Sequence, residues 1–170
     1  GVKRGLVDSE YNQRRQQCEQ AATHFGQTSL RAVSLEDLLA AEGKLDDLSF
    51  RRARHVLTEN ARTLIAADAL ANGELSTLVK VMGDSHNSMR DDFNITTPTI
   101  DRLVEIITAA GEGQAGVRMT GGGFGGCVVA VAPAAVIPRL MAAVSRTYEQ
   151  ETGCTPTLIP AKASAGAFSN

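Results

Sequence analysis

The sequence has few of the residues that mark nucleic-acid-binding proteins. Tryptophan is absent and aromatic residues make up only 4% of the 170 residues, so a surface that stacks nucleobases is not expected. Lysine and arginine form no block, and the net charge is −2, which argues against electrostatic binding of a phosphate backbone. We therefore expect no nucleic-acid partner.

Long apolar runs and closely spaced cysteines are also lacking. The sequence holds no run of 18 apolar residues and no signal peptide, so we expect no membrane association and a cytoplasmic protein. Its cysteines, Cys18, Cys127 and Cys154, are far apart, and this spacing suggests neither a zinc site nor a disulfide framework. Cys127 stands in an apolar run and is expected to be a small core residue.

The composition that remains is that of an ordinary globular domain. Hydrophobic residues make up 43% and charged residues 21%, both common values. A chain of this length can bury roughly 70% of its unfolded surface. We expect residues 1–170 to form one domain with its own core.

Hydrophobic spacing and capping residues predict several helices, followed by strands. The strongest helix is expected over residues 50–72, where apolar residues recur at helical spacing and Asn72-Gly73 is a typical stop. Other helices are expected at 9–26, 34–41, 74–91, 97–111 and 134–152, and strands at 2–7, 117–120, 127–132 and 157–161. The first helix should bury one stripe of side chains, namely Tyr11, the stem of Arg15, Cys18, Ala22 and Phe25. This order predicts an α+β fold in which helices pack on a small antiparallel sheet.

Glycine is concentrated between the two central strands. Residues 121–126 contain five glycines in six positions, which indicates positive φ angles or a close approach of the backbone to a ligand or another segment. Successive backbone N–H groups in such a loop can hold an anion. The spacing matches a dinucleotide-binding fingerprint, but that motif needs a helix after the loop, and an apolar strand is expected here. A glycine-rich hairpin without any ligand explains the spacing equally well.

Other polar residues give weaker indications. Asp91 and Asp92 are adjacent, and adjacent side chains on a helix do not face each other, so we expect a structural or capping role. His24, His55 and His86 lie on three different expected helices without a second ligand nearby. They are interpreted as surface or internal residues rather than metal ligands.

Four segments stand in order along the chain, at residues 9–19, 52–61, 85–93 and 119–127, and together they resemble galactokinases of the GHMP kinase superfamily. The run MTGGGFGGC at residues 119–127 resembles the third signature motif of these enzymes. Residues 9–19, with Ser-Glu-Tyr followed by Arg-Arg and Cys-Glu, are similar to another galactokinase segment. RARHVLTENA at 52–61 and SHNSMRDDF at 85–93 add two more, so the resemblance extends over nearly the whole chain.

The resemblance implies a fold and an activity. The fold would be the ferredoxin-like C-terminal domain of a GHMP kinase with extra helices. The activity would be ATP-dependent phosphorylation of the C1 hydroxyl of α-D-galactose with Mg²⁺. The phosphate-binding motif, the catalytic aspartate and the magnesium ligands belong to the N-terminal half of such enzymes, so the resemblance places no catalytic or metal-binding residue here. Galactose, ATP and an N-terminal GHMP domain are the implied partners, and this chain alone is expected to be inactive.

The resemblance also assigns individual residues. Tyr11 matches a tyrosine that hydrogen-bonds a sugar hydroxyl. A second set matches the loop that approaches the nucleotide phosphates and the sugar: Gly121, Gly122, Gly123, Phe124, Gly125 and Gly126. His86, Arg90, Asp91 and Asp92 are interpreted as structural support. A galactose sensor without catalysis, and a kinase for N-acetylgalactosamine or arabinose, remain alternatives, because Tyr11 cannot distinguish these sugars.

Overall fold

Helices dominate the computed structural model, which describes residues 7–164. The helices are α1 (Val7–His24), α2 (Leu35–Ala40), α3 (Asp47–Asn72), α4 (Leu75–Ser88), α5 (Pro98–Gly111) and α6 (Ile137–Thr152). Two shorter turns accompany them, the 3₁₀ turn η1 (Leu30–Ala32) and the π-helical turn η2 (Met89–Phe93). The strands are β1 (Gly116–Thr120) and β2 (Cys127–Val131). The chain therefore has the α+β fold expected, with a small antiparallel sheet and additional helices.

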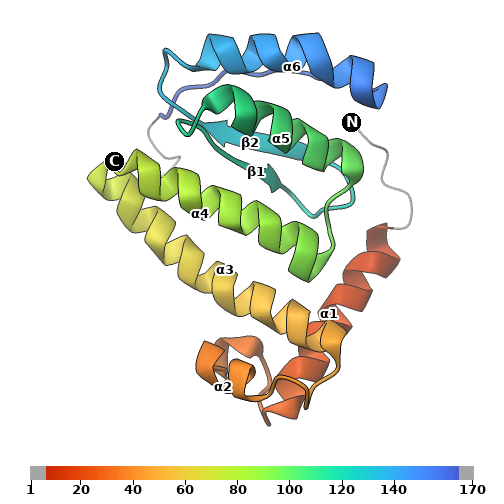
Figure 1. Cartoon of the computed structure of the whole chain (residues 1–170). Helices are drawn as coiled ribbons and strands as arrows, with labels where there is room; N and C mark the ends of the chain where they lie inside the picture. The colour runs from red at the N-terminus through yellow and green to blue at the C-terminus, as the bar shows by residue number, and fades with distance from the viewer. Residues whose placement is uncertain (1–6, 165–170) are drawn as a thin grey trace.

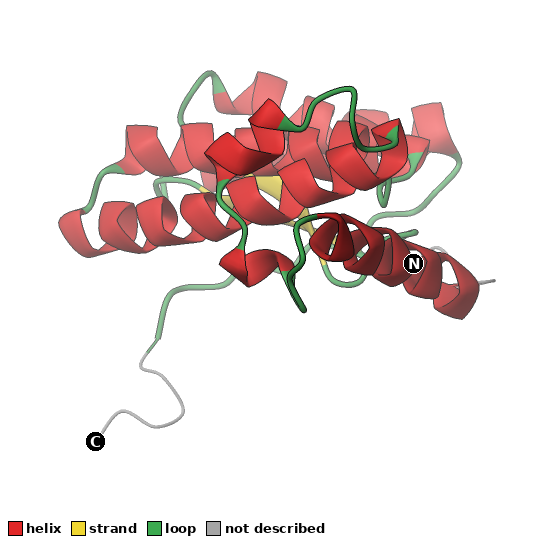
Figure 2. Cartoon of the chain, turned by 90° about the horizontal axis from the view of Figure 1, so that it is seen from below, coloured by secondary structure: helices red, strands yellow, loops and turns green. Residues whose placement is uncertain are grey.

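The strands and the last two helices form one packed unit. β1 and β2 pair antiparallel, with Gly116 opposite Val131 and Thr120 opposite Cys127. Buried side chains of α5, α6 and β1 meet in the largest core cluster, which includes Val104, Val117 and Val144. The helix α4 lies beside this unit, and α3 connects it to α1 and α2 at the other end of the molecule (Figure 1). Helical segments make up most of the chain around the small pair of strands (Figure 2).

Helix ends follow the capping residues of the sequence. The Thr97 hydroxyl accepts a hydrogen bond from Ile100 N–H, and Pro98 occupies the first position of α5. The Ser34 hydroxyl accepts one from Asp37 N–H at 3.0 Å. Gly73 ends α3 in the left-handed conformation, with φ 69°. The predictions of these helix ends are confirmed.

The helix α4 covers the edge of β1 that does not pair with β2. A Cβ atom on Gly116 would lie 2.8 Å from Met82 Sδ and 3.2 Å from Val79 Cα, so glycine permits the close approach. Further along β1, Met119 N–H donates to His86 Nδ1 at 3.3 Å. A buried strand edge therefore keeps a hydrogen-bond partner without a third strand.

The strand expected over residues 157–161 is not formed. Residues 154–164 have no regular structure, although Leu158 packs against the largest core cluster and Ile159 is 82% exposed. Pro156 and Pro160 lack the N–H groups that a strand ladder requires. The prediction is therefore wrong, and the sheet has two strands in the described residues. Most of the strand expected at 2–7 lies outside the described residues.

Two expectations about buried residues are also wrong, the second only in part, because Cys18, Ala22 and Phe25 of the α1 stripe do pack in or against a core cluster. Cys127 is exposed because β2 turns Val128 and Ala130 toward the core and Cys127, Val129 and Val131 outward. On α1, Tyr11 is 59% exposed and the Arg15 side chain is 70% exposed, whereas Arg14 is only 9% exposed. The buried face of the first turns of α1 thus lies at Arg14. No helix among residues 7–164 is both long and apolar enough to span a bilayer.

Candidate functional site

The loop of residues 121–126, the glycine loop, joins β1 to β2 with an unusual backbone. Its φ angles are 99° at Gly121, 84° at Gly123, 126° at Gly125 and 105° at Gly126. Phe124 also has a positive φ, 57°. Since L-residues rarely adopt such angles, the density of glycine follows from this backbone path.

The glycine loop is fixed to the segment that follows η2. A Cβ atom on Gly123 would lie 2.6 Å from Ile95 Cβ and 2.8 Å from the Ile95 carbonyl oxygen. The next residue, Phe124, donates its N–H to that same oxygen at 2.7 Å. The close contact with Ile95 therefore explains why residue 123 is glycine. This glycine does not serve to leave space for a ligand.

The other side of the glycine loop is open. Gly121 and Gly122 are exposed, and no atom lies within 4 Å of a Cβ placed on either of them. Among the hydrogen bonds of residues 7–164, Phe124 is the only residue of the glycine loop whose N–H donates to a loop or side-chain acceptor. Successive backbone N–H groups on an exposed, Cβ-free surface can hold an anion such as a phosphate.

Arg14 connects α1 to the glycine loop. Its Nε donates to the Phe93 carbonyl at 2.8 Å, and its Nη2 donates to the Asn94 carbonyl at 3.1 Å. The same guanidinium lies 5.5 Å from the centroid of the Phe124 ring, a cation–π distance. The sequence does not distinguish the buried Arg14 from the exposed Arg15, because the two residues are adjacent and equally polar.

Tyr11 lies one helical turn before Arg14 on the exposed part of α1. Residues three apart in a helix lie on neighbouring positions of one face, so the Arg14 contact brings the turn that carries Tyr11 toward the glycine loop. The role of Tyr11 and of the glycine loop in ligand binding stays a prediction.

A network of arginines holds η2. The buried Asp92 carboxylate accepts from Arg54 and, at 3.0 Å, from the Ser88 hydroxyl. Arg52 donates to the Asp92 carbonyl and, at 2.8 Å, to Asn94 Oδ1. Burial, followed by the charge of Arg14, lowers the pKa of Arg52 to about 10, so it stays cationic at neutral pH.

These partners agree with a structural role for the acidic pair. Asp92 faces inward to Arg54, and Asp91 pairs with Arg90 at 2.8 Å. The two carboxylates do not converge on one point. Within residues 7–164, no cluster of three or more His, Cys, Asp or Glu side chains has the geometry of a metal site.

Two histidines are internal. Burial lowers the pKa of His55 to about 4, and its Nδ1 lies 2.9 Å from the Ser88 hydroxyl. Burial also lowers the pKa of His86, whose Nδ1 accepts from Met119 N–H. Both rings are therefore neutral at neutral pH and take part in packing, which agrees with their interpretation as internal residues.

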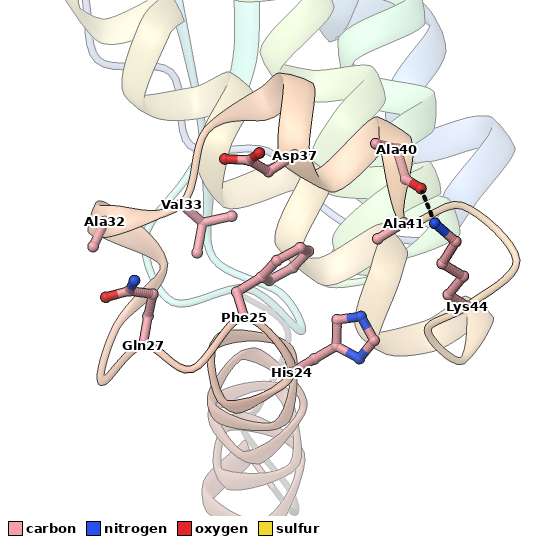
Figure 3. A pocket seen from close by; sticks show the side chains of 9 residues that line it. All are labelled: His24, Phe25, Gln27, Ala32, Val33, Asp37, Ala40, Ala41 and Lys44. Atoms are coloured by element: carbon pink, nitrogen blue, oxygen red, sulfur yellow. Dashed lines mark hydrogen bonds between the residues drawn. The ribbon is translucent and has the colours of Figure 1, made fainter.

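One cavity lies away from the glycine loop. It has a volume of about 440 Å³ and is formed by the end of α1, by η1 and by α2. Figure 3 shows His24, Phe25 and Lys44 around it, with Lys44 Nζ donating to the Ala40 carbonyl at 3.0 Å. Neither Tyr11 nor a residue of the glycine loop lines this cavity, so it is not part of the candidate site.

Comparison with known proteins identifies the family. The family described as GHMP kinases C terminal matches residues 66–150. The crystal structure of Lactococcus lactis galactokinase complexed with galactose is similar over 91% of this chain, with 33% sequence identity and a TM-score of 0.81. The match spans 41% of that protein. The chain belongs to the GHMP kinase family, and its fold is that of the family's C-terminal domain, as in galactokinase.

Proposed function

We propose that residues 1–170 are the C-terminal domain of a kinase that transfers the γ-phosphoryl group of ATP to the C1 hydroxyl of α-D-galactose. One observation carries the proposal: the glycine loop has an open, Cβ-free side at Gly121 and Gly122, and Arg14 of α1 contacts the Phe124 ring of the same loop. Support comes from the similar L. lactis galactokinase, whose structure contains galactose.

Positioning is the contribution proposed for this domain. Phosphoryl transfer depends mainly on positioning and charge stabilisation, and backbone N–H groups of the glycine loop would face the phosphates. The Tyr11 hydroxyl would donate to a sugar hydroxyl. Asp91 and Asp92 are paired with arginines and do not fit a magnesium site, so we assign Mg²⁺ and most ATP contacts to an N-terminal GHMP domain beyond this chain.

The function is tested by measuring ADP release with a sugar panel. This chain alone should show no galactose-dependent turnover, whereas the same chain joined to its N-terminal GHMP domain should phosphorylate galactose. Galactose-dependent turnover by this chain alone would contradict the assignment of catalysis to the N-terminal GHMP domain. In the joined protein, galactose binding without ADP release would indicate a sensor, and preference for N-acetylgalactosamine or arabinose would indicate a related sugar kinase.

The substitution Tyr11→Phe in the joined kinase should weaken sugar binding specifically. It removes one hydroxyl from a side chain that is 59% exposed, so folding should be unaffected. Loss of one uncharged hydrogen bond costs about 0.5–1.5 kcal/mol, which raises the galactose KM by about 2- to 13-fold. Steady-state kinetics check this, with the ATP KM as the internal control. An unchanged galactose KM would remove Tyr11 from the site.

A further inference from the structure

The end of β1 that leads into the glycine loop is held by a side chain of α4. Met119, two residues before Gly121, is fully buried and donates its N–H to His86 Nδ1 at 3.3 Å. Its carbonyl accepts from Arg118 Nε at 3.0 Å. Residues of an antiparallel pair alternate between bonding to the partner strand and bonding outward. Met119 bonds outward, and His86 takes the place of a neighbouring strand.

The open part of the glycine loop follows directly after this contact. Gly121 and Gly122 are exposed, and no atom lies within 4 Å of a Cβ placed on either of them. These two residues therefore take their position from the chain on either side. On the far side, Phe124 N–H is bonded to the Ile95 carbonyl. On the near side, the contact with His86 fixes Met119.

Asp101 of α5 determines the tautomer of the His86 ring. Its Oδ1 lies 3.3 Å from His86 Nε2, and its Oδ2 accepts from the Thr96 hydroxyl at 3.2 Å. The carboxylate favours the ring hydrogen on Nε2, which leaves the lone pair of Nδ1 for Met119 N–H. Burial lowers the pKa of His86, so this neutral tautomer is the form present at neutral pH.

The burial of His86 excludes direct contact with a substrate. Its side chain is only 4% exposed, and its two ring nitrogens face Asp101 and Met119. An effect of His86 on a bound ligand must therefore pass through Met119 into the glycine loop.

We propose that His86 is a positioning residue for the glycine loop, which holds Gly121 and Gly122, through Met119, where the phosphates of ATP would bind. This role rests on the proposed kinase function. Its consequence is selective, because the loop would contact ATP, whereas galactose is assigned to Tyr11 on α1. Releasing Met119 should weaken ATP binding and leave galactose binding unchanged.

The contact itself is tested by NMR on the ¹⁵N-labelled 170-residue chain. We expect a ¹⁵N–¹⁵N coupling across the hydrogen bond from Met119 N–H to His86 Nδ1, and a ring hydrogen on Nε2. Absence of the coupling, or a ring hydrogen on Nδ1, would overturn the proposal. The measurement needs no substrate, so its outcome does not depend on the kinase activity.

Two substitutions in the joined kinase separate the roles of the two ring nitrogens. His86→Asn keeps an acceptor at the position of Nδ1, whereas His86→Gln reaches toward Asp101 and leaves Met119 N–H without its acceptor. His86→Gln should raise the ATP KM by about 2- to 13-fold, the effect of one lost uncharged hydrogen bond. The galactose KM should not change. His86→Asn should restore most of the affinity for ATP.

The kinetic results distinguish positioning from a general loss of stability. A destabilised enzyme has a smaller folded fraction, which lowers kcat without changing KM, so a fall in kcat alone contradicts the proposal. An unchanged ATP KM in His86→Gln, or equal increases in both variants, also contradicts it. If His86→Gln does not fold, His86→Leu replaces it, since leucine fills the same buried position without an acceptor. Absence of turnover in the unsubstituted joined protein would contradict the kinase function, and the NMR coupling would still test the contact.

Discussion

The substitution Gly123→Val should destabilise the domain and inactivate the joined kinase. Gly123 has φ 84°, and its Cβ position lies 2.6 Å from Ile95 Cβ and 2.8 Å from the Ile95 carbonyl oxygen. Placing a side chain on left-handed backbone and crowding it against Ile95 together cost about 3 kcal/mol of stability. The valine would displace the loop from Ile95 and break the Phe124 hydrogen bond. We expect a fall in kcat/KM of at least about a hundredfold.

The matched control is Gly122→Val, one residue earlier. Gly122 has no positive φ, and no atom lies within 4 Å of its Cβ position, so stability should change by less than about 0.5 kcal/mol. If phosphates approach the open side of the loop, this variant folds normally but binds ATP more weakly. Thermal melts and ATP titrations separate the two effects. A stable Gly123→Val enzyme would contradict the loop geometry, and a fully active Gly122→Val enzyme would contradict ligand approach.

Local signals in the sequence were sufficient to predict most helices and strands. Thr97-Pro98 and Asn72-Gly73 mark helix ends because capping depends on a few neighbouring residues. The two strands and the loop between them follow from an apolar, β-branched run beside dense glycine. The open side of the loop could not be predicted, because a single sequence does not show that Gly123 contacts Ile95 while Gly122 contacts nothing.

Features that depend on contacts between residues far apart in the sequence could not be predicted from it. The helix expected over 74–91 passes into the π-helical turn η2 because Arg14, Arg52 and Arg54 bind groups of η2 and Asn94 from other helices. Cys127 is exposed because only one face of β2 is covered, and helical or strand periodicity does not tell which face that is.

Long-range contacts also decide that Arg14 is buried and Arg15 is exposed. This difference predicts a second large effect. The substitution Arg14→Ala should lower the stability of the chain by about 2–4 kcal/mol, since it leaves the Phe93 and Asn94 carbonyls without their donor. It also removes the cation from the Phe124 ring. We therefore expect it to loosen the glycine loop and to lower kcat in the joined kinase.

The adjacent arginine supplies the control for this prediction. Arg15 is exposed and pairs with Glu19 at 2.8 Å within α1, and such surface pairs contribute less than about 1 kcal/mol. Urea unfolding should show little change for Arg15→Ala and a large one for Arg14→Ala. The substitution Arg14→Lys keeps the charge, but lysine lacks the planar guanidinium group that donates to both carbonyls. It should therefore restore stability only in part. Equal effects of the two alanine substitutions would mean that Arg14 does not join α1, η2 and the glycine loop into one unit.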